Sequence, residues 1–318
     1  MRALRKLPFF LPFGGCRGRC VYCNQRTITG SSDIPSPEAV RETLRTLTEP
    51  VEVCYFGGSF CRFSYDTVKN YLDAVTECAP QGSRIRFSTY PGDLCDDRLR
   101  GMVLSHPIVC VELGIPSLDH NVLQSCKREA HPELILDNIA QLRDECVTLA
   151  VQVMIGLPGQ TPASSLRDLR AIAGLKGPLD WQLRLYPCLV VNDTELCRMA
   201  QSGAYKPLTL EEAVRWGGIL IDEAFSLGFT PIRVGLQESS LLASEVRGGP
   251  HHPALGELIF GEALARRLAR QSPGGPWLIP SSQISKLTGH GLFGLRRLAE
   301  MSGLSVASAR ALISLFPG

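Results

Sequence analysis

The sequence predicts an α/β protein in which helices wrap a parallel sheet and a small helical extension follows. Short β-type apolar runs alternate with longer amphipathic segments through the first two-thirds of the 318 residues, as repeated β/α units do. Hydrophobic residues make up 44% of the chain and charged residues 20%, which excludes a disordered chain. We expect a main domain over residues 1–270, then a linker and small helical tail over 271–318.

Each expected strand is followed by a segment with a helix start signal. Ser36-Pro37 and Thr161-Pro162 each supply an N-cap and a first-turn proline, and Thr209 with Glu212 forms a capping box. Periodicity leaves a partial barrel and a doubly wound sheet open, and both place the site at the C-terminal strand ends. The expected strands are 7–11, 51–56, 84–89, 108–114, 148–155 and 182–186, with a further one at 231–236 before a helix over 254–270.

Composition narrows the function classes. The net charge of +2 is too small to require a polyanionic partner. Twelve cysteines scattered through apolar runs of a long chain indicate a reducing compartment and not a secreted disulfide scaffold. The N-terminal stretch before Cys16 resembles a lipoprotein signal, but Pro8 and Pro12 interrupt it, and no later run approaches the roughly 20 apolar residues of a membrane span. We therefore expect a cytoplasmic protein without a membrane partner.

Three cysteines follow the first expected strand on a glycine-containing loop. Cys16, Cys20 and Cys23 lie within eight residues, so their sulfurs can converge on one metal centre. Iron–sulfur clusters and structural zinc normally take four protein ligands, and no fourth cysteine or histidine is close by. A cluster held by three cysteines leaves one iron open to a small molecule. The alternatives are a chance grouping and a zinc ribbon completed from a distance, for which His251-His252 is the nearest candidate.

Polar or glycine-rich residues mark the ends of the later strands. Gly57-Gly58-Ser59 can bring backbone close to a ligand, although a tight turn explains it equally. Glu112 emerges from an apolar strand and must face the barrel mouth or an ion-pair partner. Gln152 is a polar residue inside an apolar run, whereas a glycine–proline turn accounts well for Gly156 to Gly159.

These motifs together resemble the radical S-adenosylmethionine (SAM) superfamily. The resemblance implies a partial (β/α)6 TIM-like barrel, a [4Fe-4S] cluster on Cys16, Cys20 and Cys23, and reductive cleavage of SAM to a 5′-deoxyadenosyl radical. It also implies an external electron donor of the flavodoxin or ferredoxin type. The cofactor-binding residues it implies are Tyr22 before the last cysteine, Gly57, Gly58 and Ser59 for the methionine amino group, Ser88, Glu112, Arg128 for the methionine carboxylate, Gln152 for the ribose, and Gly156.

Within the superfamily the chain is similar to the elongator catalytic-subunit group, especially its short bacterial relatives. Shared stretches include Cys23-Asn24-Gln25, Arg184-Leu-Tyr-Pro187 and Arg233-Val-Gly-Leu-Gln237. Full-length members modify the wobble uridine of transfer RNA and carry an acetyltransferase domain, which we do not expect in this chain. Departures from the group are Tyr90 for a usual arginine, Pro116 for a usual glutamine, and Glu129-Ala130 for a more glycine-like turn.

Three functions stay open from the sequence. The first is a radical SAM enzyme that acts on RNA or a nucleotide, and the second is one that acts on another small molecule such as a tetrapyrrole. The third is a non-catalytic iron–sulfur or zinc protein. Arginines beside aromatic residues suit a nucleotide or a small anion. The candidate substrate-side residues are Arg184, Tyr186, Arg233, Gln237 and the turn 247–253.

Overall fold

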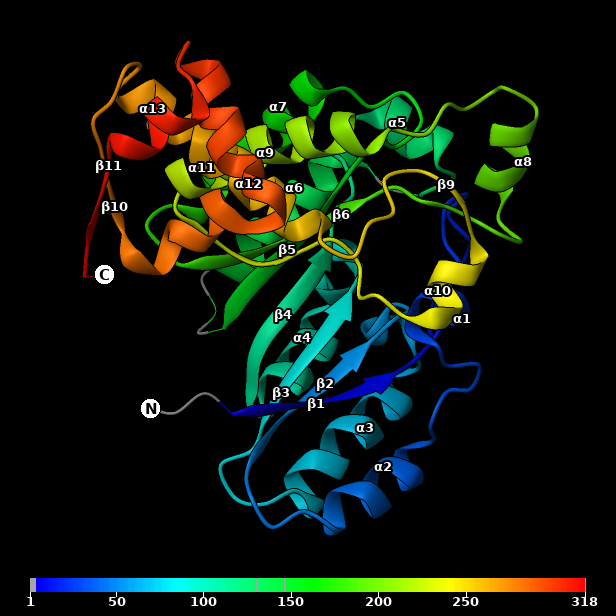
Figure 1. Ribbon diagram of the computed structural model, residues 1–318. Coiled ribbons are helices and arrows are strands. Elements are labelled where there is room, and N and C mark those ends of the chain that lie inside the picture. Colours follow the sequence, from blue (N-terminus) through cyan, green and yellow to red (C-terminus); the bar gives the residue numbers. More distant parts are fainter. Residues whose placement is uncertain (1–3, 130, 144, 146, 318) are drawn as a thin grey trace.

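The computed structural model describes residues 4–317 except 130, 144 and 146, so Ala130 and Cys146 lie outside the described residues. Seven parallel strands form one curved sheet in the order β1-β2-β3-β4-β5-β6-β8. Each strand pairs with its predecessor along this series, and there is no reversal of strand order. The structure is therefore the partial barrel and not the doubly wound sheet, a choice that periodicity left open. Helices cover the outer face of the curve (Figure 1).

The predicted strands are confirmed, four of them with the same bounds. The edge strands β1 and β8 differ by one or two residues at each end, because an edge strand has only one neighbour to fix its pairing, and β6 is one residue longer at each end. The last strand ends before Gly235, whose positive φ of 84° breaks the extended conformation. The strands are β1 (Arg5–Phe10), β2 (Val51–Phe56), β3 (Arg84–Thr89), β4 (Ile108–Gly114), β5 (Thr148–Ile155), β6 (Trp181–Pro187) and β8 (Phe229–Val234), with a separate antiparallel pair β7 (Val190–Val191) and β9 (Val246–Gly248).

The predicted helix starts are also confirmed. The side chains of Ser36, Thr161 and Thr209 each accept a hydrogen bond from a first-turn backbone N–H, and Thr209 and Glu212 form the capping box. The helices are α1 (Gln25–Thr29), α2 (Pro37–Arg45), α3 (Tyr65–Cys78), α4 (Asp97–Leu104), α5 (His120–Ser125), α6 (Pro132–Arg143), α7 (Pro162–Lys176), α8 (Glu195–Gln201), α9 (Leu210–Ser226), α10 (Ser240–Glu245), α11 (Leu255–Gln271), α12 (Ile284–Met301) and α13 (Val306–Ala311), with 3-10 turns η1 (Phe60–Arg62), η2 (Pro91–Leu94) and η3 (Ser281–Gln283).

The main core lies between the sheet and its outer helices. Apolar side chains of β2 to β6, such as Val53, Phe87 and Leu183, are fully buried against α3, α7 and α9. The opposite face of the same strands points into the barrel and carries polar side chains, Arg86 and Glu112 among them. Alternation along each strand therefore sends apolar residues outward to the helices and polar residues inward to the site.

The C-terminal segment is a small unit with its own core, formed around Trp277, Leu287, Leu295 and Leu298. Two strands, β10 (Trp277–Pro280) and β11 (Ile313–Phe316), pair in parallel here and were not expected from the sequence. They are short, and their pairing joins residues 36 positions apart, so no local pattern indicates them. In the described part of the chain, no helix has the length and apolar character to cross a membrane.

Candidate active site

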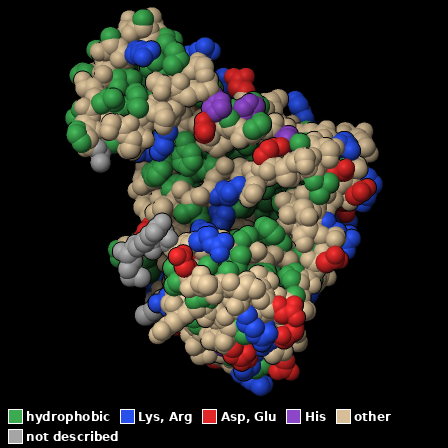
Figure 2. Space-filling model, turned by 60° about the horizontal axis from the view of Figure 1, so that its bottom comes forward, with side chains coloured by type: hydrophobic (Ala, Val, Ile, Leu, Met, Phe, Trp, Pro, Cys, Tyr) green, Lys and Arg blue, Asp and Glu red, His purple; other side chains and the backbone are tan. Residues whose placement is uncertain are grey.

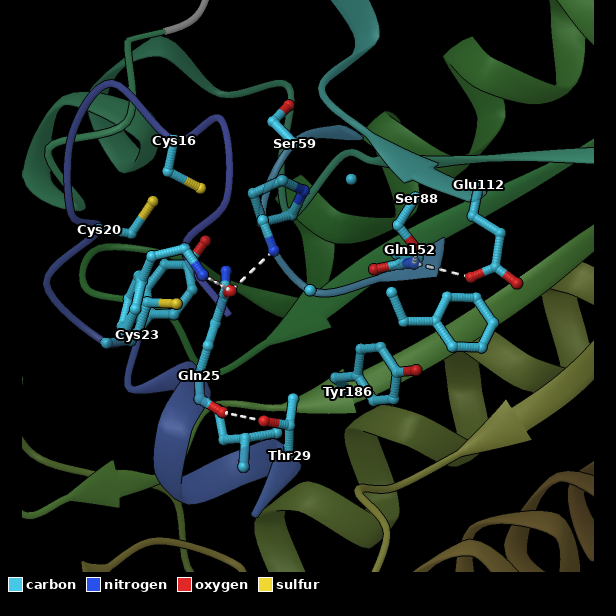
Figure 3. Close-up of a pocket in the computed structure, with 18 of the residues that line it drawn as sticks. Cys16, Cys20, Cys23, Gln25, Thr29, Ser59, Ser88, Glu112, Gln152 and Tyr186 are labelled. Atoms are coloured by element: carbon cyan, nitrogen blue, oxygen red, sulfur yellow. Dashed lines mark hydrogen bonds between the residues drawn. The ribbon is translucent and has the colours of Figure 1, made fainter. Parts of the chain in front are cut away.

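The cysteine loop leaves the C-terminal end of β1 and forms one wall of a cavity of about 720 Å³. Cys16 is exposed, whereas Cys20 and Cys23 are half-buried. A turn links the last two, because the Cys23 amide donates to the Cys20 carbonyl at 3.0 Å. Figure 3 shows the Cys16 and Cys20 sulfurs side by side, with Cys23 beneath them and Gln152 and Glu112 across the cavity.

Gln25 and Gly58 fix the cysteine loop to the end of β2. The Gln25 side-chain oxygen accepts hydrogen bonds from the amides of Phe13 and, at 2.7 Å, of Gly58. The Ser59 amide donates to the Gly14 carbonyl at 2.7 Å. A Cβ on Gly58 would lie 2.0 Å from that same carbonyl oxygen, so only glycine permits this contact. The need for glycine at 58 therefore comes from the docking of the cysteine loop.

This contact predicts a specific defect. We expect Gly58→Ala to displace the loop, because the added Cβ overlaps Gly14 and a left-handed backbone alone costs a non-glycine residue about 1–3 kcal/mol. The iron retained per chain after anaerobic reconstitution should fall accordingly. Gly18→Ala is the matched control, because a Cβ at Gly18 meets nothing within 4 Å. Equal iron content in the two variants would contradict the prediction.

The donor set fits an iron–sulfur cluster. Burial raises the pKa of the Cys23 thiol to about 12 and also raises the pKa of Cys16, with the neighbouring Cys20 adding to both. The Cys16 and Cys23 thiols therefore stay protonated unless a cation compensates their thiolates, and a cluster supplies that charge. Among the described residues no His, Cys, Asp or Glu group is arranged around a single metal ion. A four-iron cluster instead bonds each thiolate to a different iron.

Arg128 lies directly beside the cysteine loop. Its Nη1 is 3.7 Å from the Cys20 sulfur, and its Nη2 donates to the Gly114 carbonyl at 2.5 Å. Its Nε is buried and has no hydrogen-bond partner among the described residues. A buried guanidinium N–H without an acceptor is costly, so this atom fits an anionic ligand group in the cavity.

Tyr90 brings a second arginine to the same wall. The guanidinium of Arg62 lies 4.1 Å from the Tyr90 ring centre, and that of Arg128 lies 5.3 Å away. Such contacts stabilise cations on an aromatic ring. The Tyr90 hydroxyl also donates to the Glu129 carbonyl at 2.8 Å. Tyr90 thus supports an arginine from η1 on this wall.

Asp93 organises the polar groups behind this wall. Its carboxylate accepts hydrogen bonds from Ser59, from Thr89 at 2.6 Å and from the Tyr90 amide at 3.0 Å, and it pairs with Arg62 at 2.5 Å. Sequence reasoning missed Asp93, because it lies in a Pro-Gly-Asp turn where aspartate is ordinary.

Glu112 is the centre of an ion-pair network inside the barrel. Its side chain is 1% exposed, and its Oε1 accepts from Arg86 at 2.9 Å and from Arg184 at 2.8 Å. Its Oε2 accepts from the Gln152 amide at 2.9 Å, and Gln152 also donates to Ser88 at 3.3 Å (Figure 3). The structure therefore gives Glu112 the ion-pair partners that a buried acid requires, while it still lines the cavity.

Most of the residues singled out from the sequence gather around this one cavity. Those that line it are Cys16, Cys20, Tyr22, Cys23, Gly57, Gly58, Ser59, Ser88, Glu112, Arg128 and Gln152. Gly156 is not among the lining residues; a Cβ there would lie 2.8 Å from Leu208, and its carbonyl accepts from the Tyr205 hydroxyl. Arg86 was missed, although an arginine inside an apolar strand is the same signal that marked Glu112.

Comparison with protein families agrees with this geometry. Residues 10–171, about half of the chain, match the model of the radical SAM superfamily, and residues 181–264 match the Radical_SAM C-terminal domain. The chain belongs to the radical SAM superfamily. The family implies a [4Fe-4S] cluster and SAM as cofactors, and the chain is accordingly a radical SAM enzyme that needs a reductant.

Named relatives of this radical SAM protein act on transfer RNA. The chain is 24% and 27% identical to the tRNA uridine(34) acetyltransferases of Methanocaldococcus infernus and Methanocaldococcus jannaschii, over 76% of its own length. It covers only 53% and 52% of those proteins, so it spans about half their length. The solved structure of archaeal Methanocaldococcus infernus Elp3 superposes with a TM-score of 0.61 at 21% identity, covering 84% of this chain and 64% of that one.

Proposed function

We propose that this radical SAM enzyme modifies a nucleotide of transfer RNA, with Cys16, Cys20 and Cys23 holding the cluster. When bound, the cluster and SAM supply a 5′-deoxyadenosyl radical that abstracts hydrogen from a substrate. The chain's own residues position these groups and the substrate. The named relatives support tRNA as the substrate class. The observation that carries the proposal is the positive charge on the cavity wall formed by the two edge strands, β1 and β8.

That wall carries two cationic side chains, one on each edge strand of the sheet. β1 and β8 are the two edges of the open barrel, and Lys6 on one and Arg233 on the other both line the cavity. Among the described residues neither pairs with a carboxylate. Arg184, by contrast, forms an ion pair with Glu112. The open seam between the edge strands therefore offers two free cations to an anionic substrate, as a phosphate backbone requires.

Aromatic side chains lie beside these cations. Phe10, Phe56 and Tyr186 line the same cavity, and the Arg184 guanidinium lies 5.5 Å from the Phe56 ring centre. Unpaired RNA bases are commonly bound by stacking on aromatic rings, with cations at the flanking phosphates. This combination favours a nucleotide in the cavity, because a small carboxylate needs no stacking surface.

On the cofactor side the proposed tasks follow from the contacts. Arg128 would hold the SAM carboxylate through its unpartnered Nε while its other nitrogens stay fixed to Cys20 and Gly114. Gln152 and Ser88 would face the nucleoside part, anchored through Glu112. Tyr22 and the turn at Gly57, Gly58 and Ser59 would close the space around the cluster.

The reductant is proposed to be an external donor of the flavodoxin or ferredoxin type. Arg17, Arg19 and Arg26 are exposed around the cysteines and would attract an acidic partner. We also place the enzyme in the cytoplasm, because the described cysteines are all free and a reducing compartment keeps them so.

Anaerobic assay of the reconstituted enzyme tests the proposal. With SAM, a strong reductant and unmodified tRNA transcripts, we expect tRNA to stimulate 5′-deoxyadenosine formation and a new nucleoside to appear by mass spectrometry of the digested tRNA. Arg233→Gln should lower the tRNA-dependent kcat/KM by roughly 10- to 100-fold, the effect of losing one charge-assisted hydrogen bond of about 1.5–3 kcal/mol.

The control for that variant is Arg215→Gln, an exposed arginine on α9 that pairs with Glu211. It should retain the wild-type kcat/KM. If 5′-deoxyadenosine forms but tRNA neither stimulates it nor changes, the tRNA substrate is wrong; if none forms, the assignment of the cluster site is wrong.

A further inference from the structure

The C-terminal unit contains two helices joined by a short turn. The regular helix of α12 is interrupted by four non-helical residues, 289–292, and then continues to Met301. Residues 302–305 make a turn in which Gly303 has a φ of 64°, and Ser305 caps α13 by accepting a hydrogen bond from the Ser308 amide at 3.1 Å. Two helices connected by a four-residue turn with a left-handed glycine form a helix-turn-helix.

The packing holds these two helices in fixed register. Leu295, Leu298 and Ala299 of the first helix and Ala309 of the second are buried in the core of the C-terminal unit. Small alanines at the contact let the helix backbones approach closely. The opposite faces are exposed and carry Arg296 on the first helix, and Ala307, Ser308 and Arg310 on the second.

The charge of this segment differs from that of the rest of the chain. Residues 272–318 contain four Lys or Arg and a single acid, Glu300, whereas the whole chain contains 33 basic and 31 acidic residues. Glu300 forms an ion pair with Arg297, and Arg297 also pairs with Glu262 at 2.7 Å. Arg296 and Arg310 have no carboxylate partner in the part of the chain that the structure describes. The helix-turn-helix is thus net positive, with two free arginines.

The unit also lies beside the rim of the cavity. The ring of His290, in the interruption of α12, lies 6.3 Å from that of His252, and the adjacent His251 pairs with Glu238 at 2.9 Å. Gln237 and Ser239, on either side of Glu238, line the cavity. In Figure 2 the lobe at the upper left borders the hollow in which Lys and Arg side chains are visible. A long polyanion can therefore contact both.

We propose that this helix-turn-helix, residues 293–312, docks the sugar–phosphate backbone of the RNA substrate; the RNA as occupant rests on the proposed function. α13 has six residues, a length of about 9 Å, and its exposed side chains include a single arginine, Arg310, and no Asn or Gln to read a base edge. Sequence-specific reading of a DNA groove needs several side chains that form hydrogen bonds with base edges. Two arginines and a serine instead suit phosphates of a structured RNA, held without regard to sequence.

Filter binding of the anaerobically reconstituted full chain to unmodified tRNA transcripts tests the proposal. Arg296→Gln combined with Arg310→Gln should weaken tRNA binding by about tenfold or more at low salt. The slope of log affinity against log salt between about 50 and 200 mM should also become shallower by roughly 1.5, as expected for two lost phosphate contacts. Thermal unfolding checks that the variant is folded, because both side chains are exposed.

The matched control is Arg84→Gln combined with Arg98→Gln, two exposed arginines in the first third of the chain, and it should bind tRNA as the wild type does. Equal loss in the two double variants, or no loss in the first, would overturn the docking surface. Tighter binding of a random-sequence DNA duplex than of tRNA would overturn the choice of RNA. Wild-type protein that cleaves SAM but retains no tRNA refutes this inference while leaving the radical SAM assignment intact.

Discussion

Cys20→Ala is expected to abolish cluster assembly and SAM cleavage together. Cys20 lies between the other two cysteines, its carbonyl accepts the Cys23 amide, and its sulfur receives a hydrogen bond from Arg128. With only two thiolates left, the site no longer provides three bonds to a cluster. We expect iron and sulfide per chain to fall to the background, and 5′-deoxyadenosine formation to fall by more than about 100-fold, the upper end of the effect of losing an outer-shell partner.

The control for this variant is Cys78→Ala, because Cys78 is a half-buried thiol at the end of α3 and away from the cavity. It should reconstitute with wild-type iron content and activity. A Cys20→Ala protein that keeps its iron and still cleaves SAM would show that the three cysteines do not hold the cluster.

Glu112→Gln is expected to give the largest loss of stability. The carboxylate compensates Arg86 and Arg184 inside the barrel, and its second oxygen accepts from Gln152. A glutamine removes the negative charge and turns an N–H₂ donor toward another donor. Breaking a buried pair by removing one partner costs about 3–5 kcal/mol, so we expect a loss of that size in the free energy of unfolding, measured by denaturant titration.

Glu211→Gln supplies the comparison, because Glu211 is 73% exposed and pairs with Arg215 on the surface of α9. Exposed pairs contribute about 0–1 kcal/mol, so this variant should unfold close to wild type. If the two glutamate variants lose the same stability, the network around Glu112 does not support the barrel.

Local patterns predicted the strands and helix starts well because each is a short-range property. The runs at Val51–Phe56 and Ile108–Gly114 are apolar, bounded by turns and long enough to be buried strands, and the structure has them with the predicted bounds. Ser36 and Thr209 cap helices through contacts three residues away. In contrast, β10 and β11 are short and pair only with each other, so the sequence offered no local signal for them.

The sequence could single out a site residue only where its residue type is unusual for its position in a strand or loop. Glu112 and Gln152 interrupt apolar strands, and three closely spaced cysteines have few alternatives. Asp93 and Arg62 sit in ordinary turn positions, and their meeting with Ser59 and Tyr90 depends on how η1 and η2 pack beyond the strand ends. Gly156 is the opposite case, a residue that the sequence singled out but that does not line the cavity. A Cβ there would lie 2.8 Å from Leu208, so the close packing of Leu208 requires a glycine.

The sequence by itself determined the α/β class, the order of the strands along the chain, the cysteine loop and the resemblance to radical SAM proteins. Tertiary structure alone decided which charges are compensated: Arg184 pairs with Glu112, whereas Lys6 and Arg233, on the two edges of the seam, meet no carboxylate within residues 4–317 as far as these are described. The physical reason is that ionic interactions between exposed charges are screened beyond about 8–10 Å at physiological salt, so they depend on which strands become neighbours. That pairing is set by the curvature of the whole sheet and not by any one segment.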